Sequence, residues 1–260
     1  MARLHGAGLV VEHNALLYKR TWRGTLFTSL LNPVLLLAAM GLGLGSLVNH
    51  HSGQTSLGTG SYIAFVGPGL MAAAAMQIGA AESMYPLMAS IKWLRVFDGM
   101  LASPLEVTDL VLGHMAWASL RLLQTTTVFA IALVVFGAAQ SPLVVLAIPA
   151  AILTGLAFTA PIAAYTATQQ NDIGFSVVFR LVVMPLFLFS GTFFPISQLP
   201  AWLRPVAYLT PLWHGVELCR SLSLGQGSVA AAVGHVAVLC AFIIGGVLVA
   251  DRTFKGRLAS

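Results

Sequence analysis

The fold of this chain is decided by residues 193–225, which read FFPISQLPAWLRPVAYLTPLWHGVELCRSLSLG and lie between two long apolar segments. Four of the chain's twelve prolines and five aromatic residues fall within this stretch: Pro195, Pro200, Pro205, Pro211, Phe193, Phe194, Trp202, Tyr208 and Trp213. Proline breaks a helix unless it lies in the first turn, and aromatic side chains gather at membrane–water interfaces. The stretch is therefore too interrupted for a membrane span and too apolar for an ordinary loop.

The composition around this stretch is that of a membrane protein. Of the 260 residues, 58% are hydrophobic and only 8% are charged, whereas a soluble surface needs far more charge. A helix that crosses a bilayer needs roughly 20 mostly apolar residues, because its backbone polar groups must be satisfied within the helix. We therefore predict an all-α membrane protein, in one domain over residues 1–260.

Six apolar segments are long enough to cross the membrane: residues 26–48, 62–81, 107–136, 142–165, 173–190 and 229–250. Pro33 is expected to kink the first segment, and Pro149 and Pro161 to interrupt the fourth. The third is longer than a bilayer requires, so its first turns are expected to project into the cytoplasm. Gly41 and Gly45 form a GxxxG match, which fits packing within the chain as well as a dimer seam.

Residues 1–25 precede the first span and carry an amphipathic pattern. Apolar side chains recur at helical spacing, and charged ones occupy another face: Val11, Ala15, Tyr18 and Trp22 against Glu12, Lys19, Arg20 and Arg23. We expect an interfacial helix that lies along the cytoplasmic surface of the membrane. A plain positively charged flank of the first span is the alternative.

Lysine and arginine residues outside the spans predict the orientation. Nine fall on the side of the termini and two on the other: Arg3, Lys19, Arg20, Arg23, Lys92, Arg95, Arg252, Lys255 and Arg257 against Arg204 and Arg220. Positive charge accumulates on the cytoplasmic side, so both termini and residues 83–106 are placed in the cytoplasm and residues 193–225 outside. Orientation explains the net charge of +5 better than a nucleic-acid surface does.

The prolines of residues 193–225 are placed to start helices. Pro200 suits the first turn of a short helix through Ala207, and Pro211 that of a second helix through about Leu224. We predict an external re-entrant hairpin between spans five and six, in which Glu217 and Arg220 are spaced to pair, with or without a functional role. The residues singled out for this hairpin are Pro195, Pro200, Trp202, Pro211, His214, Glu217 and Arg220.

Residues 83–106 are the counterpart on the cytoplasmic side. They join the second span to the third, and a turn is predicted at Ser103 and Pro104. We expect a short internal helix that offers Lys92, Arg95 and Asp98 to a partner. Simple solvation of a loop is the alternative for any one of these charges.

Apart from Asp109, which lies in the turns expected to project into the cytoplasm, three charged residues fall at or within the spans, where a charge costs at least about 2.5 kcal/mol at the helix centre. Glu82 and Arg180 lie close enough to a span end for their side chains to reach the cytoplasmic interface. Arg121 lies deeper if its span begins at Val107. It is therefore the candidate for a substrate pathway.

No catalytic chemistry is expected from this chain. It has no G-x-x-x-x-G-K-[ST] loop to hold nucleotide phosphates, and Cys219 and Cys240 form neither a CxxC pair nor a ligand cluster, so no metal site is predicted and one disulfide stays possible. A rhomboid-type serine protease is excluded because Leu188 stands where its G-x-S-G turn needs glycine. An ion-coupled secondary transporter remains the alternative, although the spans hold no mid-membrane carboxylate.

Two stretches resemble a known family. One is residues 98–105, DGMLASPL, with Asp109 and Gly113 after it, and the other carries the order FP, LP, PLxH and Arg at Phe194-Pro195, Leu199-Pro200, Pro211-Leu212, His214 and Arg220. Together with the interfacial helix and the six spans, they make nearly the whole chain similar to permease subunits of ABC-2 type transporters. The resemblance is strongest to exporters of nodulation factors and of daunorubicin-type drugs.

The resemblance implies a permease in a bacterial cell membrane that exports an amphipathic substrate, such as a drug, an antibiotic or a glycolipid. It implies a second permease subunit, identical or different, and two cytoplasmic ABC ATPases that bind ATP and magnesium. This chain would then bind no cofactor, and its partners would be those subunits and membrane lipids rather than nucleic acid. Residues 83–106 would be the coupling helix that contacts the ATPase.

Overall fold

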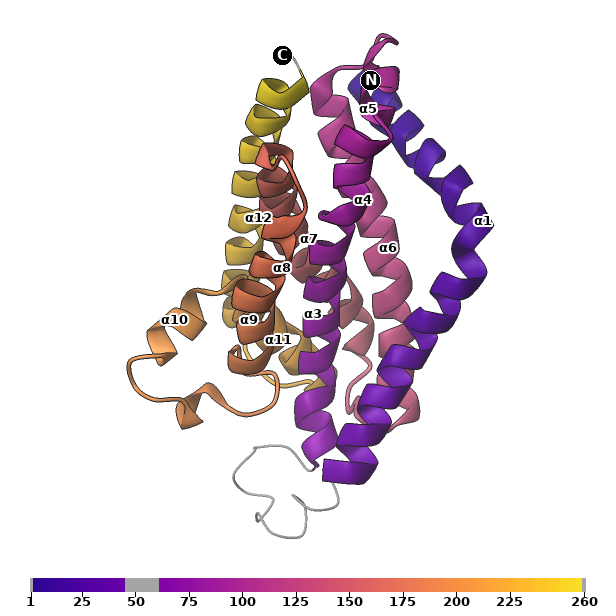
Figure 1. The fold of residues 1–260 in the computed structure, drawn as a ribbon. Helices are drawn as coiled ribbons and strands as arrows, with labels where there is room; N and C mark the ends of the chain where they lie inside the picture. Colours follow the sequence, from indigo (N-terminus) through magenta and orange to yellow (C-terminus); the bar gives the residue numbers. More distant parts are fainter. Residues whose placement is uncertain (1, 45–60, 259–260) are drawn as a thin grey trace.

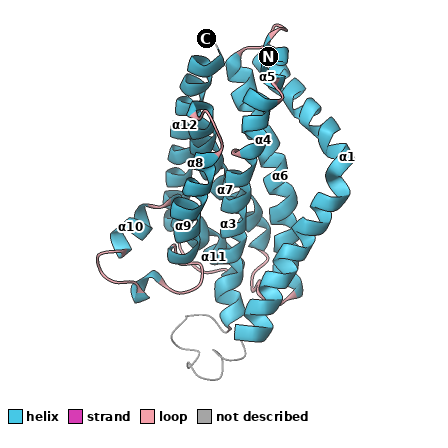
Figure 2. Cartoon of the chain, viewed as in Figure 1, coloured by secondary structure: helices cyan, strands magenta, loops and turns pink. Residues whose placement is uncertain are grey.

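The computed structural model describes residues 2–44 and 61–258, and within them the chain is helical with no strand (Figure 2). The all-α prediction is confirmed. Most of the predicted loop at residues 49–61, and Gly45 of the GxxxG match, lie outside the described residues. The elements in chain order are α1 (Ala2–Ala38), π-helical η1 (Ala39–Leu44), α3 (Tyr62–Glu82), α4 (Tyr85–Met88), π-helical η3 (Ala89–Trp93), α5 (Val96–Leu101), α6 (Val107–Val135), α7 (Val144–Thr168), α8 (Ile173–Val178), π-helical η4 (Phe179–Val183), α9 (Met184–Phe189), 3₁₀-helical η5 (Ile196–Gln198), α10 (Arg204–Leu209), α11 (Pro211–Leu224) and α12 (Val229–Leu258).

Among the described residues, four helical segments are long and apolar enough to cross a membrane: Tyr62–Trp93, Val107–Val135, Val144–Thr168 and Val229–Leu258. They correspond to the predicted spans two, three, four and six. The predicted fifth span is the shorter apolar run Ile173–Phe189, and its 17 residues reach about 25 Å, somewhat less than a hydrocarbon core of about 30 Å. The count of six spans stays a prediction.

The helices differ from the predicted spans in two details, and the interfacial position of residues 1–25 stays a prediction. The interfacial helix and the first span are not separate, because α1 runs without a break from Ala2 to Ala38 and only bends midway in Figure 1. No proline lies between the two predicted pieces to stop the helix. Pro149 and Pro161 lie inside α7 without interrupting it, as neighbouring helices make proline tolerable in membrane helices.

Helix α7 is the centre of the bundle. It packs against α3, α6, α11 and α12, while α1 lies along the outer side of α6 (Figure 1). Most of the apolar window of α3 is buried inside the protein, whereas that of α12 is mostly exposed. The interior is therefore α3 and α7, with the other long helices around them.

The approach of α3 to α7 depends on two glycines. A Cβ atom on Gly79 would lie 2.4 Å from the carbonyl oxygen of Gly155, and a Cβ on Gly155 would lie 2.9 Å from the carbonyl oxygen of Ala75. Lipid offers no hydrophobic force between membrane helices, so they associate through close packing at small residues. The backbones of α3 and α7 are in contact here because neither glycine has a side chain.

The two ends of the bundle carry different elements. In Figure 1 both termini lie at the upper end with α5, and α10 and α11 lie in the lower half. The termini thus share one end, as the even number of predicted spans requires. The segment predicted to be cytoplasmic is well separated from the one predicted to be external.

We expect Gly79→Ala to destabilise the protein by about 1–3 kcal/mol, because the new methyl group meets the Gly155 carbonyl and the backbones must separate. The measurement is the temperature at which half of the purified protein remains monodisperse in detergent. Gly234→Ala on α12 is the matched control, since its Cβ would meet no atom within 4 Å. Equal melting of the two variants would contradict the close approach.

Candidate functional site

The segment between α3 and α6, residues 83–106, bends back on itself at an exposed end, and we call this segment the hook. After a turn at Ser83 and Met84 the chain continues through α4 and η3, and Arg95 then adopts a left-handed conformation with φ of 50° before α5. Arg95 is the only non-glycine residue with positive φ in the described part of the chain. Such backbone conformations cost about 1–3 kcal/mol and cluster at functional sites.

The three charges predicted for this segment do not act alike. Arg95 Nε donates to Asp98 Oδ2 over 2.6 Å, and this pair lies at the surface. Lys92 Nζ instead donates to the backbone carbonyl of Gln170, in the turn between α7 and α8. Lys92 therefore joins η3 to the turn after α7 while staying at the surface, and Arg95 and Asp98 pair with each other.

Two apolar residues of the hook were missed by the sequence reasoning. Leu94 is 72% exposed and Trp93 is 51% exposed, directly beside Arg95. The run Lys92-Trp93-Leu94-Arg95, with two large apolar residues between charges, was the available signal. Tryptophan and arginine are enriched among the residues that dominate the binding energy of protein interfaces.

The base of the hook is fixed inside the bundle. Ser83 is fully buried, its hydroxyl lies 3.1 Å from His114 Nε2 of α6, and its carbonyl accepts a 2.6 Å hydrogen bond from Thr166 Oγ1 of α7. The joint between α3 and α4 is therefore bonded to two other helices. Nothing in the spacing of these residues along the chain indicated this contact.

At the other end, α11 begins and ends where the sequence predicted. Thr210 caps its first turn by accepting from the Trp213 N–H, Pro211 occupies the first position, and Gly225 ends the helix at φ 67°. The first helix of the predicted hairpin is wrong: α10 runs from Arg204 to Leu209, because Pro205 and not Pro200 occupies its first turn. The loop before it holds Pro195, Pro200 and Trp202, of which Trp202 is 74% exposed.

Arg220 of α11 is buried and joins three segments. Its Nη1 pairs with Glu217 Oε1 at 2.6 Å, Nε donates to the Phe65 carbonyl of α3 at 3.1 Å, and Nη2 donates to the Gly191 carbonyl at 2.7 Å. The guanidinium also lies 3.9 Å from the centre of the Phe65 ring. Burial lowers the pKa of Arg220, and Glu217 opposes that shift, so the predicted pairing is confirmed and holds a buried charge in place.

His214, also predicted for this region, connects α11 to α12. Its Nδ1 lies 2.8 Å from Nδ1 of His235, and the Trp213 ring contacts both imidazoles edge-on. One nitrogen must donate and the other accept, so this contact holds a single proton between the two rings. The predicted residues of α11 thus form two contacts, one to α3 and one to α12.

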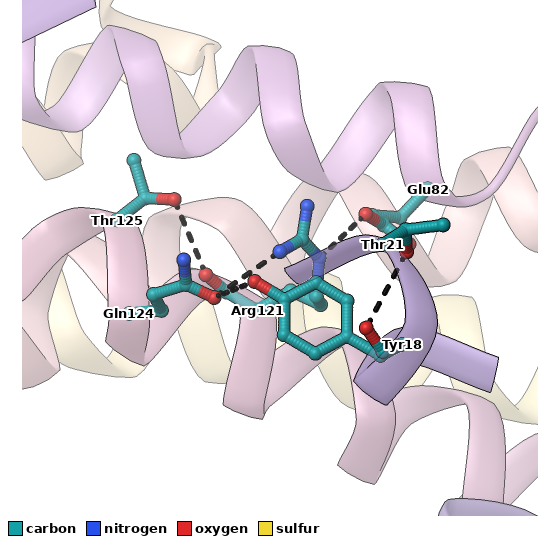
Figure 3. Close-up of polar contacts among 6 residues, drawn as sticks. All are labelled: Tyr18, Thr21, Glu82, Arg121, Gln124 and Thr125. Atoms are coloured by element: carbon teal, nitrogen blue, oxygen red, sulfur yellow. Dashed lines mark hydrogen bonds and ion pairs between the residues drawn. The ribbon is translucent and has the colours of Figure 1, made fainter. Parts of the chain in front are cut away.

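Arg121 is the centre of a polar cluster between α1, α3 and α6 (Figure 3). Its Nε donates to Glu82 Oε1 at 2.9 Å, and its Nη1 donates to Gln124 Oε1 at 3.2 Å. Tyr18 of α1 donates to the same Gln124 oxygen at 2.7 Å, and its ring lies 4.8 Å from the guanidinium carbon. The pairing with Glu82 was missed because the two residues are 39 positions apart.

In the part of the chain that the structure describes, no three His, Cys, Asp or Glu side chains gather as metal ligands would. Cys219 and Cys240 are both free thiols there. The distinctive polar features are thus the hook, the Arg220 contacts and the Arg121 cluster.

Comparison with known proteins agrees with this arrangement. Residues 7–224 match the model of the family described as ABC-2 type transporter. The chain belongs to the ABC-2 transporter family. Members of this family are membrane components of transport, are not themselves catalytic, and typically work with an ABC ATPase.

The similar proteins share nearly the full length of this ABC-2 chain. Nodulation protein J of Rhizobium leguminosarum bv. viciae is 31% identical over 262 residues, which cover 99% of this chain and 98% of that protein. Nodulation protein J of Bradyrhizobium diazoefficiens is 32% identical over 250 residues, covering 96% and 92%. These relatives are ABC-2 permease subunits, so the resemblance to nodulation-type permeases is confirmed.

The residues that first suggested the ABC-2 family have physical roles in this fold. Asp109 forms a capping box with Glu106 at the start of α6. Gly113 leaves room for Val10 of α1, since a Cβ there would lie 2.5 Å from the Val10 side chain. Asp109 therefore helps to start α6, and Gly113 allows α1 to pack closely against α6.

We expect Arg220→Lys to destabilise this ABC-2 permease by about 2–4 kcal/mol, because an ammonium group cannot reach Phe65, Gly191 and Glu217 together and leaves buried acceptors unpaired. Thermal unfolding of the purified variant measures the effect. The control is Arg204→Lys, which also loses bonds to two backbone carbonyls but from a half-buried position, where water can replace them and the cost is about 1 kcal/mol. The role assigned to Arg220 is wrong if the two variants unfold at the same temperature.

Proposed function

We propose that this chain is the permease subunit of an ATP-driven exporter that moves an amphipathic substrate, a drug, antibiotic or glycolipid, out of the cell. ATP and magnesium are bound by a separate ABC ATPase. The observation that carries the proposal is the relationship to nodulation proteins J over nearly the whole chain. The lack of a phosphate-binding loop in the sequence supports a separate source of energy.

The hook is the part that receives the ATPase. Its outward-facing surface is Lys92, Trp93, Leu94, Arg95 and Asp98, which combines apolar area with a lysine and an ion pair. Two ATPases would each contact one permease subunit through this surface. The second permease, identical or different, completes the pathway.

The segment of α10 and α11 is the external end of the pathway. It lies away from the hook and the termini, and α11 packs against α3 and α7 rather than standing apart from the bundle (Figure 1). This supports a re-entrant arrangement in a protein of six spans, with both termini in the cytoplasm of a bacterium. Arg220 then fixes the re-entrant helix to α3 beside the exit.

The ion-coupled alternative has little support in the spans. Glu82 lies at the end of α3 and is paired with Arg121, so it is not a free carboxylate at mid-membrane. Export from vesicles that needs ATP and survives dissipation of ion gradients separates the two mechanisms. Export that follows the gradient would favour the secondary transporter.

We expect the double variant Leu94→Ser with Arg95→Asn to lose at least about tenfold in co-purification with the ATPase, since central interface residues each contribute more than about 1 kcal/mol. Asparagine tolerates the left-handed backbone of Arg95, so the hook keeps its shape. Pull-down of the ATPase and transport in vesicles are measured together. Arg252→Glu, an exposed charge change on α12, is the control that should keep both. Undiminished pull-down by the double variant would exclude the hook as the docking surface.

We expect cysteines at the two ends to react from opposite sides of the membrane. Gln198 is exposed in the loop before α10, and Leu94 is exposed in the hook. In a background without Cys219 and Cys240, a membrane-impermeant thiol reagent added outside cells should label Gln198→Cys, and should label Leu94→Cys only after the membrane is opened. Labelling of Gln198→Cys from the cytoplasm alone would reverse the topology.

A further inference from the structure

The cleft between α1 and α6 is a polar opening on the side of the bundle. It has a volume of about 460 Å³ and is lined by Asn14, Leu17, Tyr18, Arg20, Thr21, Glu82, Trp117 and Arg121. A larger groove of about 670 Å³ between α7 and α12 is lined mostly by apolar residues. The α1–α6 cleft therefore differs in having two arginines and one carboxylate at its wall.

The cleft lies at the depth of lipid headgroups. Helix α3 has 21 residues from Tyr62 to Glu82, and it spans about 30 Å, which is the thickness of a hydrocarbon core. Tyr62 is suited to one interface, so Glu82 and its partner Arg121 lie at the other. A ligand in the cleft is thus level with the phosphates of one leaflet.

One nitrogen of the central arginine of the cleft is unused. Arg121 uses Nε and Nη1, but its Nη2 makes no hydrogen bond to any described residue. Gln124 does not line the cleft, but its side-chain oxygen accepts from both Arg121 and Tyr18 and so helps to hold the guanidinium in place (Figure 3).

The charge of the cleft favours an anion. Glu82 neutralises one arginine, and Arg20 makes no ion pair with any residue that the structure describes, so one positive charge remains. Guanidinium groups bind phosphate oxygens through two parallel hydrogen bonds. Arg121 is already oriented by Glu82, Gln124 and Tyr18, which reduces the entropy lost when a ligand binds.

Both helices expose apolar side chains beyond the cleft, toward the other end of the bundle. Leu31 and Leu35 of α1 are 41% and 57% exposed, and Leu123 and Ile131 of α6 are 45% and 60% exposed. A molecule with a phosphate in the cleft can therefore lay hydrocarbon chains along these helices. We propose that the α1–α6 cleft binds the phosphate-bearing headgroup of an anionic membrane lipid, a site that does not depend on the exporter function.

The test is native mass spectrometry of the full-length protein in detergent, titrated with phosphatidylglycerol or with phosphatidylcholine. We expect one preferred phosphatidylglycerol site, and Arg20→Gln should weaken it about fivefold, because a direct charge-assisted contact of about 1 kcal/mol between Arg20 and the phosphate corresponds to that factor. The control is Lys19→Gln, which removes the same charge from the adjacent residue, outside the cleft. It should leave the preferred site within about twofold of the parent protein. Equal losses from both variants, or equal affinity for the two lipids, would overturn the proposal.

A second variant reverses the sign of the effect. Glu82→Gln keeps an oxygen for Arg121 but removes the negative charge, so phosphatidylglycerol should bind about threefold more tightly. If Glu82 served only to hold Arg121 in place, its replacement would weaken lipid binding or leave it unchanged. Unchanged or weaker binding by a folded Glu82→Gln protein therefore also overturns the site.

The source of the phosphate is tested separately. Inorganic phosphate added at millimolar concentration should not displace phosphatidylglycerol, because it lacks the chains that contact α1 and α6. Displacement at concentrations equal to those of the lipid would assign the cleft to a soluble anion and contradict the proposal. No step of this experiment uses ATP or transport. A negative result would therefore not count against the proposed exporter function, and a loss of transport would not count against the lipid site.

Discussion

The contact of α3 with α7 at Gly79 and Gly155 is the constraint on which the rest of the bundle depends. In a membrane, helices gain nothing from hiding apolar side chains from lipid, so association rests on close packing and on interhelical polar contacts. A helix in the position of α7 must therefore touch its neighbours closely. It does so on several sides at once, since α6, α11 and α12 pack on it as well as α3. Removing this contact would separate the two helices that position all the others.

Interhelical polar contacts then fix the relative positions of helices that packing alone does not determine. Arg220 and Arg121 are both buried or nearly so, and each is paired with a carboxylate and bonded to further groups. In an apolar surrounding a charge without such partners is very costly, so each arginine has few acceptable positions. Arg220 specifies how α11 meets α3, and Arg121 specifies how α6 meets α1 and the end of α3. The two sites are at different depths of the bundle and act on different helices.

The sequence predicted those features that depend on neighbouring residues. The limits of α3, α6 and α11 follow from local signals such as Ser61 at one start and Thr210-Pro211 at another. Features that depend on distant residues could not be predicted. The Phe65 carbonyl that Arg220 contacts is 155 positions away, and Lys92 bonds to Gln170 across 78 positions, so neither partner could be identified from the local sequence. The continuity of α1 could be predicted only in part. The charge pattern suggested an interfacial helix followed by a separate span, but the sequence has no helix-breaking residue between them.

The joint at Ser83 explains how a movement at the hook would reach the bundle. A flexible linker between α3 and α4 would absorb any displacement of α5, and the helices would not respond. Ser83 is buried and bonded to His114 of α6 and Thr166 of α7, so the base of the hook is attached to three helices at one point. Glu82 precedes it directly and carries Arg121 with it. In the coupling that we propose, a force applied at Arg95 would be transmitted to α3, α6 and α7 together, and the α1–α6 cleft lies beside that same joint.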